Sequence, residues 1–183
     1  MLAKQQVIDI LRAEISTEDE LVLGKESESA WLFHTVDKKY LKTRDPQYIP
    51  LGSSKGLIQK ADGKVHWFNW RWTDEESLKI CDLGYFKYDH WDLEITRVLD
   101  ESLALKYLSQ LELESVVREG AHGVFVTTRT RLSSERLAQI LKNAPVRFFL
   151  GDARMKWKIL ETFKSQAAFT YQLSEHDWGT KCV

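Results

Sequence analysis

The sequence predicts an α+β protein in which an N-terminal helix packs on a curved antiparallel sheet, followed by a ferredoxin-like β-α-β-β-α-β unit with an extra helix and strand. Three observations lead to this prediction. Apolar residues recur at helical spacing near the N-terminus, short strand-like segments separated by turn residues fill the first half, and helices and strands alternate in the second half. With 183 residues, of which 43% are hydrophobic and 29% charged, the chain can bury a globular core.

The first half begins with a helix over residues 3–15, because apolar side chains recur on one face: Ala3, Val7, Ile8, Leu11 and Ile15. Strands are predicted at 21–23, 30–36, 56–60 and 64–70, with a helical turn at 37–43. Gly63 can supply the positive φ of a tight hairpin between the last two strands. Together these elements predict a helix on an antiparallel sheet.

The second half follows a boundary that we expect within residues 73–90, where Thr73 is a good N-cap for an acidic helix. Two regions are predicted, 1–75 and 91–175, although one continuous sheet is an equal alternative. Strands are expected at 91–99, 114–119, 123–131 and 146–150, with a hairpin turn at Gly120-Ala121-His122. Helices should begin at Asp100 and Ser134, and a third, capped by Asp152, should precede a strand at 167–173.

The segment from Ala30 to Trp70 contains the most specific pattern of the chain. In order along the sequence it contains Trp31, Phe33, Tyr40, Leu41, Thr43, Asp45, Leu51, Gly52, Leu57, Ile58, Lys60, Asp62, Gly63, Val65 and His66. This order resembles the YrhB-like bacterial immunity proteins, small single-domain proteins often encoded beside polymorphic toxins. The resemblance covers roughly the first 75 residues and implies fold more specifically than activity.

What the resemblance implies is a non-enzymatic immunity protein that binds and neutralises a cognate toxin domain, for example a nuclease. It assigns no catalytic residue. The chain departs from the family by adding about a hundred residues after the matching part, and these added residues are an alternative location for the toxin-binding surface.

Composition argues against several other classes. The net charge of −1 gives no overall field that would attract nucleic acid or an anionic membrane. No run approaches the roughly 20 apolar residues that span a bilayer, and residues 1–14 lack the apolar stretch of a signal peptide. Cys81 and Cys182 lie about a hundred residues apart and predict no structural disulfide. We therefore expect a reduced, cytoplasmic protein without membrane contact.

Catalytic chemistry has little support in the sequence. The histidines occur singly, whereas zinc sites usually place two ligands close together: His34, His66, His90, His122 and His176. There is no G-x-S-x-G elbow, and the loop 51–56 lacks the spacing of a phosphate-binding loop. We therefore expect no enzyme activity, no metal and no cofactor. A less favoured interpretation is an enzyme that uses Glu94 or Glu119 with a nearby histidine.

Two groups of residues are candidates for contact with a toxin. In the aromatic segment 67–72, the predicted partner-binding residues are Trp70, Arg71 and Trp72, since Trp and Arg are enriched in interface hot spots. A strand would place Phe68 on the face of Trp70 and Trp72, and Trp67 on the other face. The second group is acidic and would mimic phosphates in the cleft of a nuclease: Glu18, Asp19, Glu20, Asp74, Glu75 and Glu76. Its ordinary alternative is a solvated position or the first turn of a helix.

The alternative function is a nucleic-acid-binding or regulatory module in the second half. The sequence TTRTR at 127–131 places Arg129 and Arg131 on one face of a strand, together with Phe125. Arginines and an aromatic ring on a ferredoxin-like sheet are typical of RNA recognition. A solvated sheet face is the commoner explanation, so nucleic acid is the second choice. The oligomeric state is not predicted.

Overall fold

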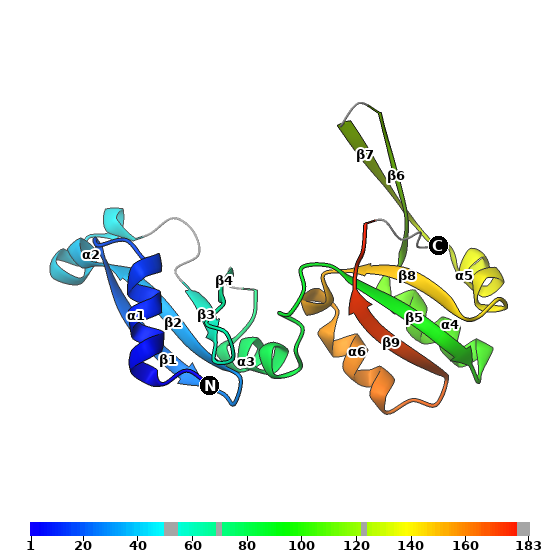
Figure 1. Cartoon of the computed structure of the whole chain (residues 1–183), viewed down its shortest axis with the longest axis horizontal. Coiled ribbons are helices and arrows are strands. Elements are labelled where there is room, and N and C mark those ends of the chain that lie inside the picture. Colours follow the sequence, from blue (N-terminus) through cyan, green and yellow to red (C-terminus); the bar gives the residue numbers. More distant parts are fainter. Residues whose placement is uncertain (50–54, 69–70, 122–123, 179–183) are drawn as a thin grey trace. The chain divides into compact units, whose positions relative to one another are not determined.

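The computed structural model describes residues 1–49, 55–68, 71–121 and 124–178, and it divides the chain into two compact units, Met1–Phe86 and Lys87–Val183. Each unit has its own antiparallel sheet, with strand order β1-β2-β3-β4 in the first and β7-β6-β8-β5-β9 in the second (Figure 1). The mixed α+β class predicted from the sequence is confirmed. The division falls within residues 73–90, where the sequence changes from an acidic helix to an aromatic stretch.

The first unit contains a helix ahead of a four-stranded sheet whose strands follow their order in the chain. Its strands are β1 (Asp19–Glu26), β2 (Ala30–Asp37), β3 (Lys55–Gln59) and β4 (Val65–Phe68). Its helices are α1 (Lys4–Glu14), α2 (Lys38–Thr43), the 3₁₀ helix η1 (Pro46–Tyr48) and α3 (Asp74–Asp82). The predicted cap at Thr73 is confirmed, since its hydroxyl accepts from the Glu76 N–H and the Glu76 carboxylate accepts from the Thr73 N–H.

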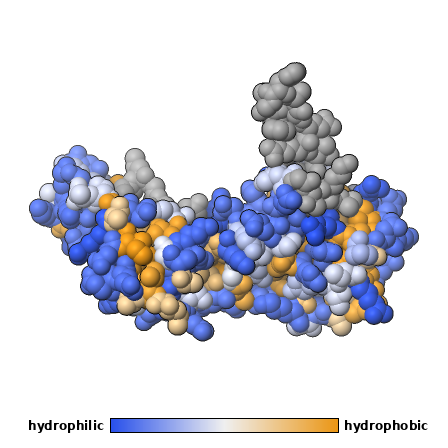
Figure 2. All heavy atoms as spheres, in the orientation of Figure 1, coloured by the Kyte–Doolittle hydropathy of each residue, from blue (hydrophilic) through white to orange (hydrophobic). Residues whose placement is uncertain are grey.

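Helix α1 packs on one face of this sheet through Val7 and Leu11, which are fully buried together with Phe33 and Ile58. The strand register explains this face, because Leu23 lies opposite Phe33 and Ile58 lies opposite both Trp31 and Val65. Figure 2 shows apolar residues gathered where α1 meets the sheet. Of the predicted apolar face, Val7 and Leu11 are thus confirmed as core residues, whereas Ala3 is exposed at the N-cap and Ile15 is the C-cap.

Gly56 allows the closest contact within this core. A Cβ atom at Gly56 would lie 2.5 Å from Cζ of Phe33 and 2.8 Å from the carbonyl oxygen of His66. The Phe33 ring therefore occupies the space above the glycine and reaches the next strand, where it meets Trp67 edge to face with ring centres 4.8 Å apart. Glycine is required here by packing on a neighbouring ring.

The second unit alternates strands and helices as predicted. Its elements are β5 (Trp91–Val98), α4 (Glu101–Leu108), η2 (Ser109–Leu111), β6 (Glu114–Ala121), β7 (Val124–Arg131), α5 (Ser134–Leu141), β8 (Val146–Gly151), η3 (Ala153–Met155), α6 (Trp157–Lys164) and β9 (Phe169–Glu175). Asp100 caps α4 as predicted by accepting from the Leu103 N–H. Asp152 caps the 3₁₀ helix η3, and α6 begins later, so its predicted place at the start of the third α-helix is wrong.

Each helical crossover in this unit joins two parallel strands that are separated by one antiparallel strand, which is the split β-α-β arrangement. The strand order differs from that of a ferredoxin-like sheet. Here the fourth strand of the unit, β8, lies between the first and second strands, β5 and β6, whereas a ferredoxin-like sheet places its first strand between the third and the fourth. Gly120 and Ala121 belong to β6, and Ala121 pairs with Val124, so the predicted turn at these two residues is wrong. His122 of that turn lies outside the described residues.

The two faces of the second sheet differ. Alternate residues on one face are buried, among them Leu93, Ile95 and Phe148, and α6 contacts this face where Phe163 meets the rings of Phe169 and Tyr171. We call the opposite face the open face, defined by the aligned residues Glu94, Arg147, Gln172, Asp92, Phe149 and Ser174. Its Glu94 and Arg147 are partly exposed and joined at 3.3 Å, as expected for a solvated sheet face.

We predict that Gly56→Ala lowers the free energy of unfolding by about 1–3 kcal/mol, because the new methyl group forces the Phe33 ring or the β4 backbone to move. Gly24→Ala is the matched control on β1, since its Cβ would meet Leu32 at an ordinary 3.4 Å. Urea denaturation of both variants measures the difference. Equal stability of the two variants would contradict the proposed role of Gly56.

Candidate functional site

The aromatic segment after β4 differs from the expected strand. β4 ends at Phe68, and Trp72 lies just before α3, so the predicted placement of Trp72 on the strand is wrong. Its half-buried ring packs edge to face against Phe68 at 6.1 Å and Phe86 at 6.3 Å. Arg71 is exposed, and Trp70 lies outside the described residues. Trp72 therefore packs inside the first unit, next to α3, and this packing leaves only part of its ring for contact with a partner.

Lys55 is a buried cation that organises this region. Its side chain is 2% exposed, and its Nζ lies 2.6 Å from Oδ1 of Asp74 and donates to the carbonyl oxygen of Trp72 at 3.2 Å. The ammonium also lies 5.5 Å from the centre of the Phe68 ring. The hydrogen bond from Lys55 lowers the pKa of Asp74. Asp74 is thereby committed to an internal ion pair.

Three of the other acidic candidates, Glu75, Glu76 and Glu18, also contact groups of this unit. Glu75 bonds Lys25 at 2.6 Å, and Glu76 completes the capping box with Thr73. In the first acidic group, Glu18 lies 3.4 Å from Lys39, while Asp19 and Glu20 begin β1 opposite residues of β2. These contacts match the ordinary explanation of acidic residues at helix and strand starts better than they match a phosphate mimic.

Trp67 is a large aromatic side chain that the described part of this unit exposes beside its core. It lies on the edge strand β4, opposite Gly56, and its side chain is 43% exposed. As predicted, it faces away from the buried Phe68, and its edge-to-face contact with Phe33 fixes the ring. Sequence alternation identified this face, but nothing in the sequence favoured Trp67 over Trp70 as a contact residue.

A buried Asp–His pair lies on the open face of the second unit. Nδ1 of His176 lies 2.7 Å from Oδ1 of Asp92, and the two side chains are 3% and 0% exposed. The His176 ring meets Phe149 at 4.7 Å and Trp178 at 4.5 Å, both edge to face. Because a substrate cannot reach an imidazole buried to this extent, the pair serves to anchor the chain after β9.

Sequence reasoning missed the Asp92–His176 pair because 84 positions separate its members. Only the register of β5 with β9 brings them together, since Trp91 pairs with Glu175 and the His176 N–H donates to the His90 carbonyl. The carboxylate proposed for an enzyme, Glu94, instead bonds Arg147 on the same face. The side chain of Glu119 lies outside the described set.

Arg129 and Arg131 lie on one side of β7, as predicted. The Arg129 guanidinium lies 5.1 Å from the centre of the Phe149 ring, and Arg131 bonds Glu112 at 3.0 Å. Both line a cavity of about 410 Å³ together with Lys156. The pKa of Lys156 lies below its ordinary value because burial disfavours the charged ammonium, and nearby carboxylates, Glu114 first, oppose this shift. The side chain of Phe125, expected on this face, is outside the described part.

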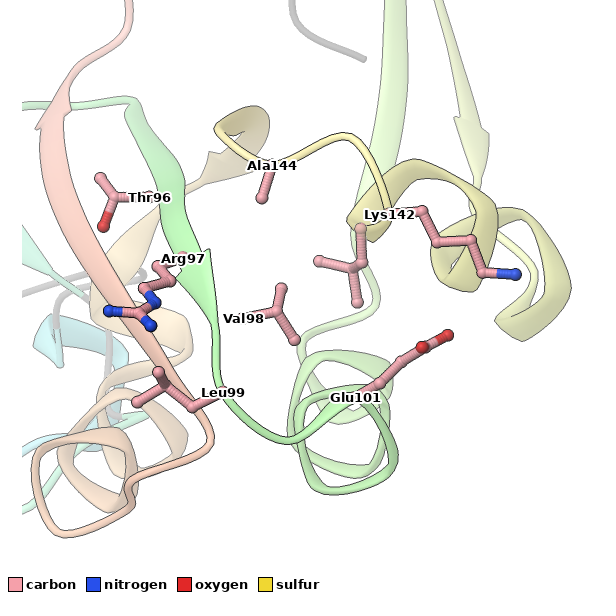
Figure 3. Close-up of a pocket in the computed structure, with 8 residues that line it drawn as sticks. Thr96, Arg97, Val98, Leu99, Glu101, Lys142 and Ala144 are labelled. Carbon is pink, nitrogen blue, oxygen red and sulfur yellow. The ribbon is translucent and has the colours of Figure 1, made fainter.

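A second cavity, of about 430 Å³, lies at the far end of β5 beside α4 and α5 (Figure 3). Figure 3 shows Val98 and Ala144 directed toward its middle, while Arg97 and Lys142 point away from it. Ligand pockets usually combine an apolar lining with a few converging polar groups that orient the ligand. Since the charged side chains diverge here, we assign no ligand to this cavity.

Metal and thiol chemistry find little support among the described residues. No three His, Cys, Asp or Glu side chains in the described ranges come close enough to hold a metal ion. Burial raises the pKa of the free Cys81 thiol to about 11, so this thiol is a poor nucleophile near neutral pH. Within the same ranges, the helices are too short or too polar to cross a bilayer.

Comparisons of the chain with protein-family models, with curated proteins and with solved structures found no match. The resemblance of residues 30–70 to the YrhB-like immunity proteins therefore stays a prediction from the sequence.

We predict that Asp74→Asn lowers the free energy of unfolding by about 1–2 kcal/mol at neutral pH. This is less than the roughly 3–5 kcal/mol of a fully buried pair because the Asp74 side chain is 35% exposed. The folded-state pKa of Asp74 lies below its ordinary 3.8. Its stabilisation is therefore complete above the unfolded-state pKa and is lost as the pH falls through the folded-state pKa.

Urea denaturation at about pH 7 and at about pH 3 measures this effect, and the gap between wild type and Asp74→Asn should shrink at the lower pH. Glu75→Gln is the control, since its pair with Lys25 is mostly exposed and should contribute little. A gap that stays constant with pH would show that the Asp74 charge does not provide the stabilisation.

Proposed function

We propose that this protein is a non-enzymatic immunity protein that binds and neutralises a cognate bacterial toxin domain. The sequence resemblance over residues 30–70 motivates the proposal. The observation that carries it is Trp67, a large ring held in place by Phe33 and still 43% exposed on an edge strand. Rigid, partly exposed tryptophans are frequent hot spots of protein interfaces, because they bury much area with little loss of conformational entropy.

The internal contacts of the acidic residues affect the proposed mode of inhibition. Asp74, Glu75 and Glu76 already bond Lys55, Lys25 and the Thr73 backbone, respectively, so using them against a basic cleft would break these contacts. Apolar contact at Trp67 requires no such exchange. We therefore favour an aromatic anchor at Trp67 over phosphate mimicry, with Arg71 as an exposed neighbour in the chain. We also propose a cytoplasmic location, where the protein would meet a toxin that acts inside the cell and where a free thiol such as Cys81 stays reduced.

Calorimetric titration with the toxin-like domain encoded beside the gene tests this function, and we expect nanomolar affinity. Trp67→Ala should weaken binding by about thirtyfold or more, as removal of a hot-spot side chain does. Val22→Ala is the control, since Val22 is a similarly exposed apolar residue on the opposite edge strand. Circular dichroism checks that both variants remain folded. No binding by the wild-type chain would reject the function, and an unaffected Trp67→Ala would reject the surface.

A second candidate, a single-stranded nucleic-acid-binding module, is favoured by one observation on the open face. There the Arg129 guanidinium covers the Phe149 ring, and Trp178 lies 5.9 Å from that ring with 37% of its side chain exposed. An exposed ring beside an arginine is a usual means of holding an unpaired base, and here that ring is Trp178, because Phe149 is only 2% exposed. The carboxylates of Glu112 and Glu114 in the neighbouring cavity oppose phosphate binding, which is why this candidate ranks second.

For this candidate we predict a gel shift of single-stranded RNA at low salt that weakens as salt rises, because bound phosphates release counterions. Trp178→Ala and Arg129→Ala should each weaken the shift, whereas Arg97→Ala, at the far end of the second unit's sheet, should leave it unchanged. A complete lack of shift at low salt would eliminate the nucleic-acid function.

A further inference from the structure

The β6–β7 hairpin extends beyond the sheet from which it starts. In the described residues, Glu114 alone of β6 pairs with β8, opposite Phe149, whereas β6 and β7 pair with each other from Glu114–Arg131 to Ala121–Val124. Figure 1 shows the hairpin projecting from the second unit as a two-stranded arm. A two-stranded ribbon without further strands is only marginally stable in water, so such an arm favours the addition of another strand.

The direction of the backbone amides on β7 follows from the register. The Leu132 N–H donates to the Leu113 carbonyl at 2.9 Å, so Leu113 and Leu132 form a hydrogen-bonded pair. In an antiparallel ladder such pairs alternate with pairs whose amides point outward. Thr130 and Thr128 therefore bond to β6, whereas the N–H and C=O of Arg131 and Arg129 point away from it.

An independent contact supports this alternation. Glu114 is the partner of Arg131 on β6, and its outward backbone groups are the ones that pair with β8. On the other side of the ribbon, β7 is the terminal strand of the sheet order. Among the described residues, the outward groups of Arg129 and Arg131 thus form an open edge, which can accept a further strand.

We infer that the β7 edge at residues 128–131 is a docking edge where an extended segment of the protein partner adds as a further antiparallel or parallel strand. This inference rests on the proposed function, because it supplies the way in which the toxin domain is held. Strand addition combines main-chain hydrogen bonds for affinity with alternate side chains for specificity.

Charge at this edge selects the kind of segment. Arg129 and Arg131 are exposed at alternate positions, and Arg131 already bonds a carboxylate, Glu112. A second copy of this chain, paired antiparallel about Thr130, would place Arg129 of each copy opposite Arg131 of the other, and like charges directly opposite are destabilising. A toxin segment with a carboxylate opposite Arg129 satisfies the same edge.

The test separates the backbone of Arg129 from its side chain by titrating the full chain with the toxin-like domain. Arg129→Pro removes the outward N–H without removing a ladder bond, since proline is tolerated where a strand edge faces solvent. It should weaken binding by about ten- to hundredfold, because a partner carbonyl loses its donor. Arg129→Ala keeps the N–H and should cost about two- to fivefold, with a weaker salt dependence.

Val116→Pro is the matched control, because Val116 pairs with Arg129 and its N–H points from the opposite edge of the ribbon. It should bind like the wild-type chain. Amide hydrogen exchange gives a second measurement: Arg129 and Arg131 should exchange faster than Thr128 and Thr130 in the free protein and become protected in the complex.

Each outcome decides the inference. Wild-type binding with unaffected Arg129→Pro, or equal losses for Arg129→Pro and Val116→Pro, overturns the docking edge and leaves the immunity function standing. A loss as large for Arg129→Ala as for Arg129→Pro also overturns it, since the side chain would then carry the contact. Protection of Arg129 that rises with protein concentration alone indicates pairing between copies and overturns it as well. No binding by the wild-type chain removes the immunity function and the docking edge together.

Discussion

The first unit depends on one buried ammonium group. Lys55 is the first residue of the inner strand β3 and has 2% of its side chain exposed, and transferring an unpaired cation to such a site costs several kcal/mol. Asp74 and the Trp72 carbonyl offset this cost, and both belong to the segment that enters α3. The charge on β3 therefore joins the start of α3, which the Thr73–Glu76 capping box defines, to the sheet, next to Trp72 and its contacts with Phe68 and Phe86.

This constraint decides which side chains remain for a partner. Because the α3 segment uses Asp74, Glu75, Glu76 and Trp72 in its own contacts, the surface that we propose for the partner lies on the edge strand β4, where Trp67 packs on Phe33. Gly56 leaves room for the Phe33 ring, and this ring in turn contacts Trp67 edge to face. In the second unit, the packed rings of Phe149, His176 and Trp178 cover part of the open face. The strand edge that stays unpaired among the described residues there belongs to the β6–β7 hairpin.

Local patterns predicted most of the secondary structure because helix faces and caps depend on neighbours three or four residues away. The α1 face, the caps at Thr73 and Asp100, and the shared side of Arg129 and Arg131 are examples. The failures lie where local signals are equal or absent. Asp152 caps a 3₁₀ turn as well as it would cap an α-helix, and Gly120 is as compatible with a strand as with a turn.

By itself, the sequence determined the α+β class and the order of the main helices and strands, and it supplied a set of candidate contact residues. Tertiary structure decided which of these residues are available, since availability depends on contacts between distant positions. Lys55 meets Asp74, and Asp92 meets His176, only after the strands have paired in register. Among the described residues, the open edge of β7 likewise exists because β7 ends the strand order of its sheet, and no local pattern in the sequence specifies that order.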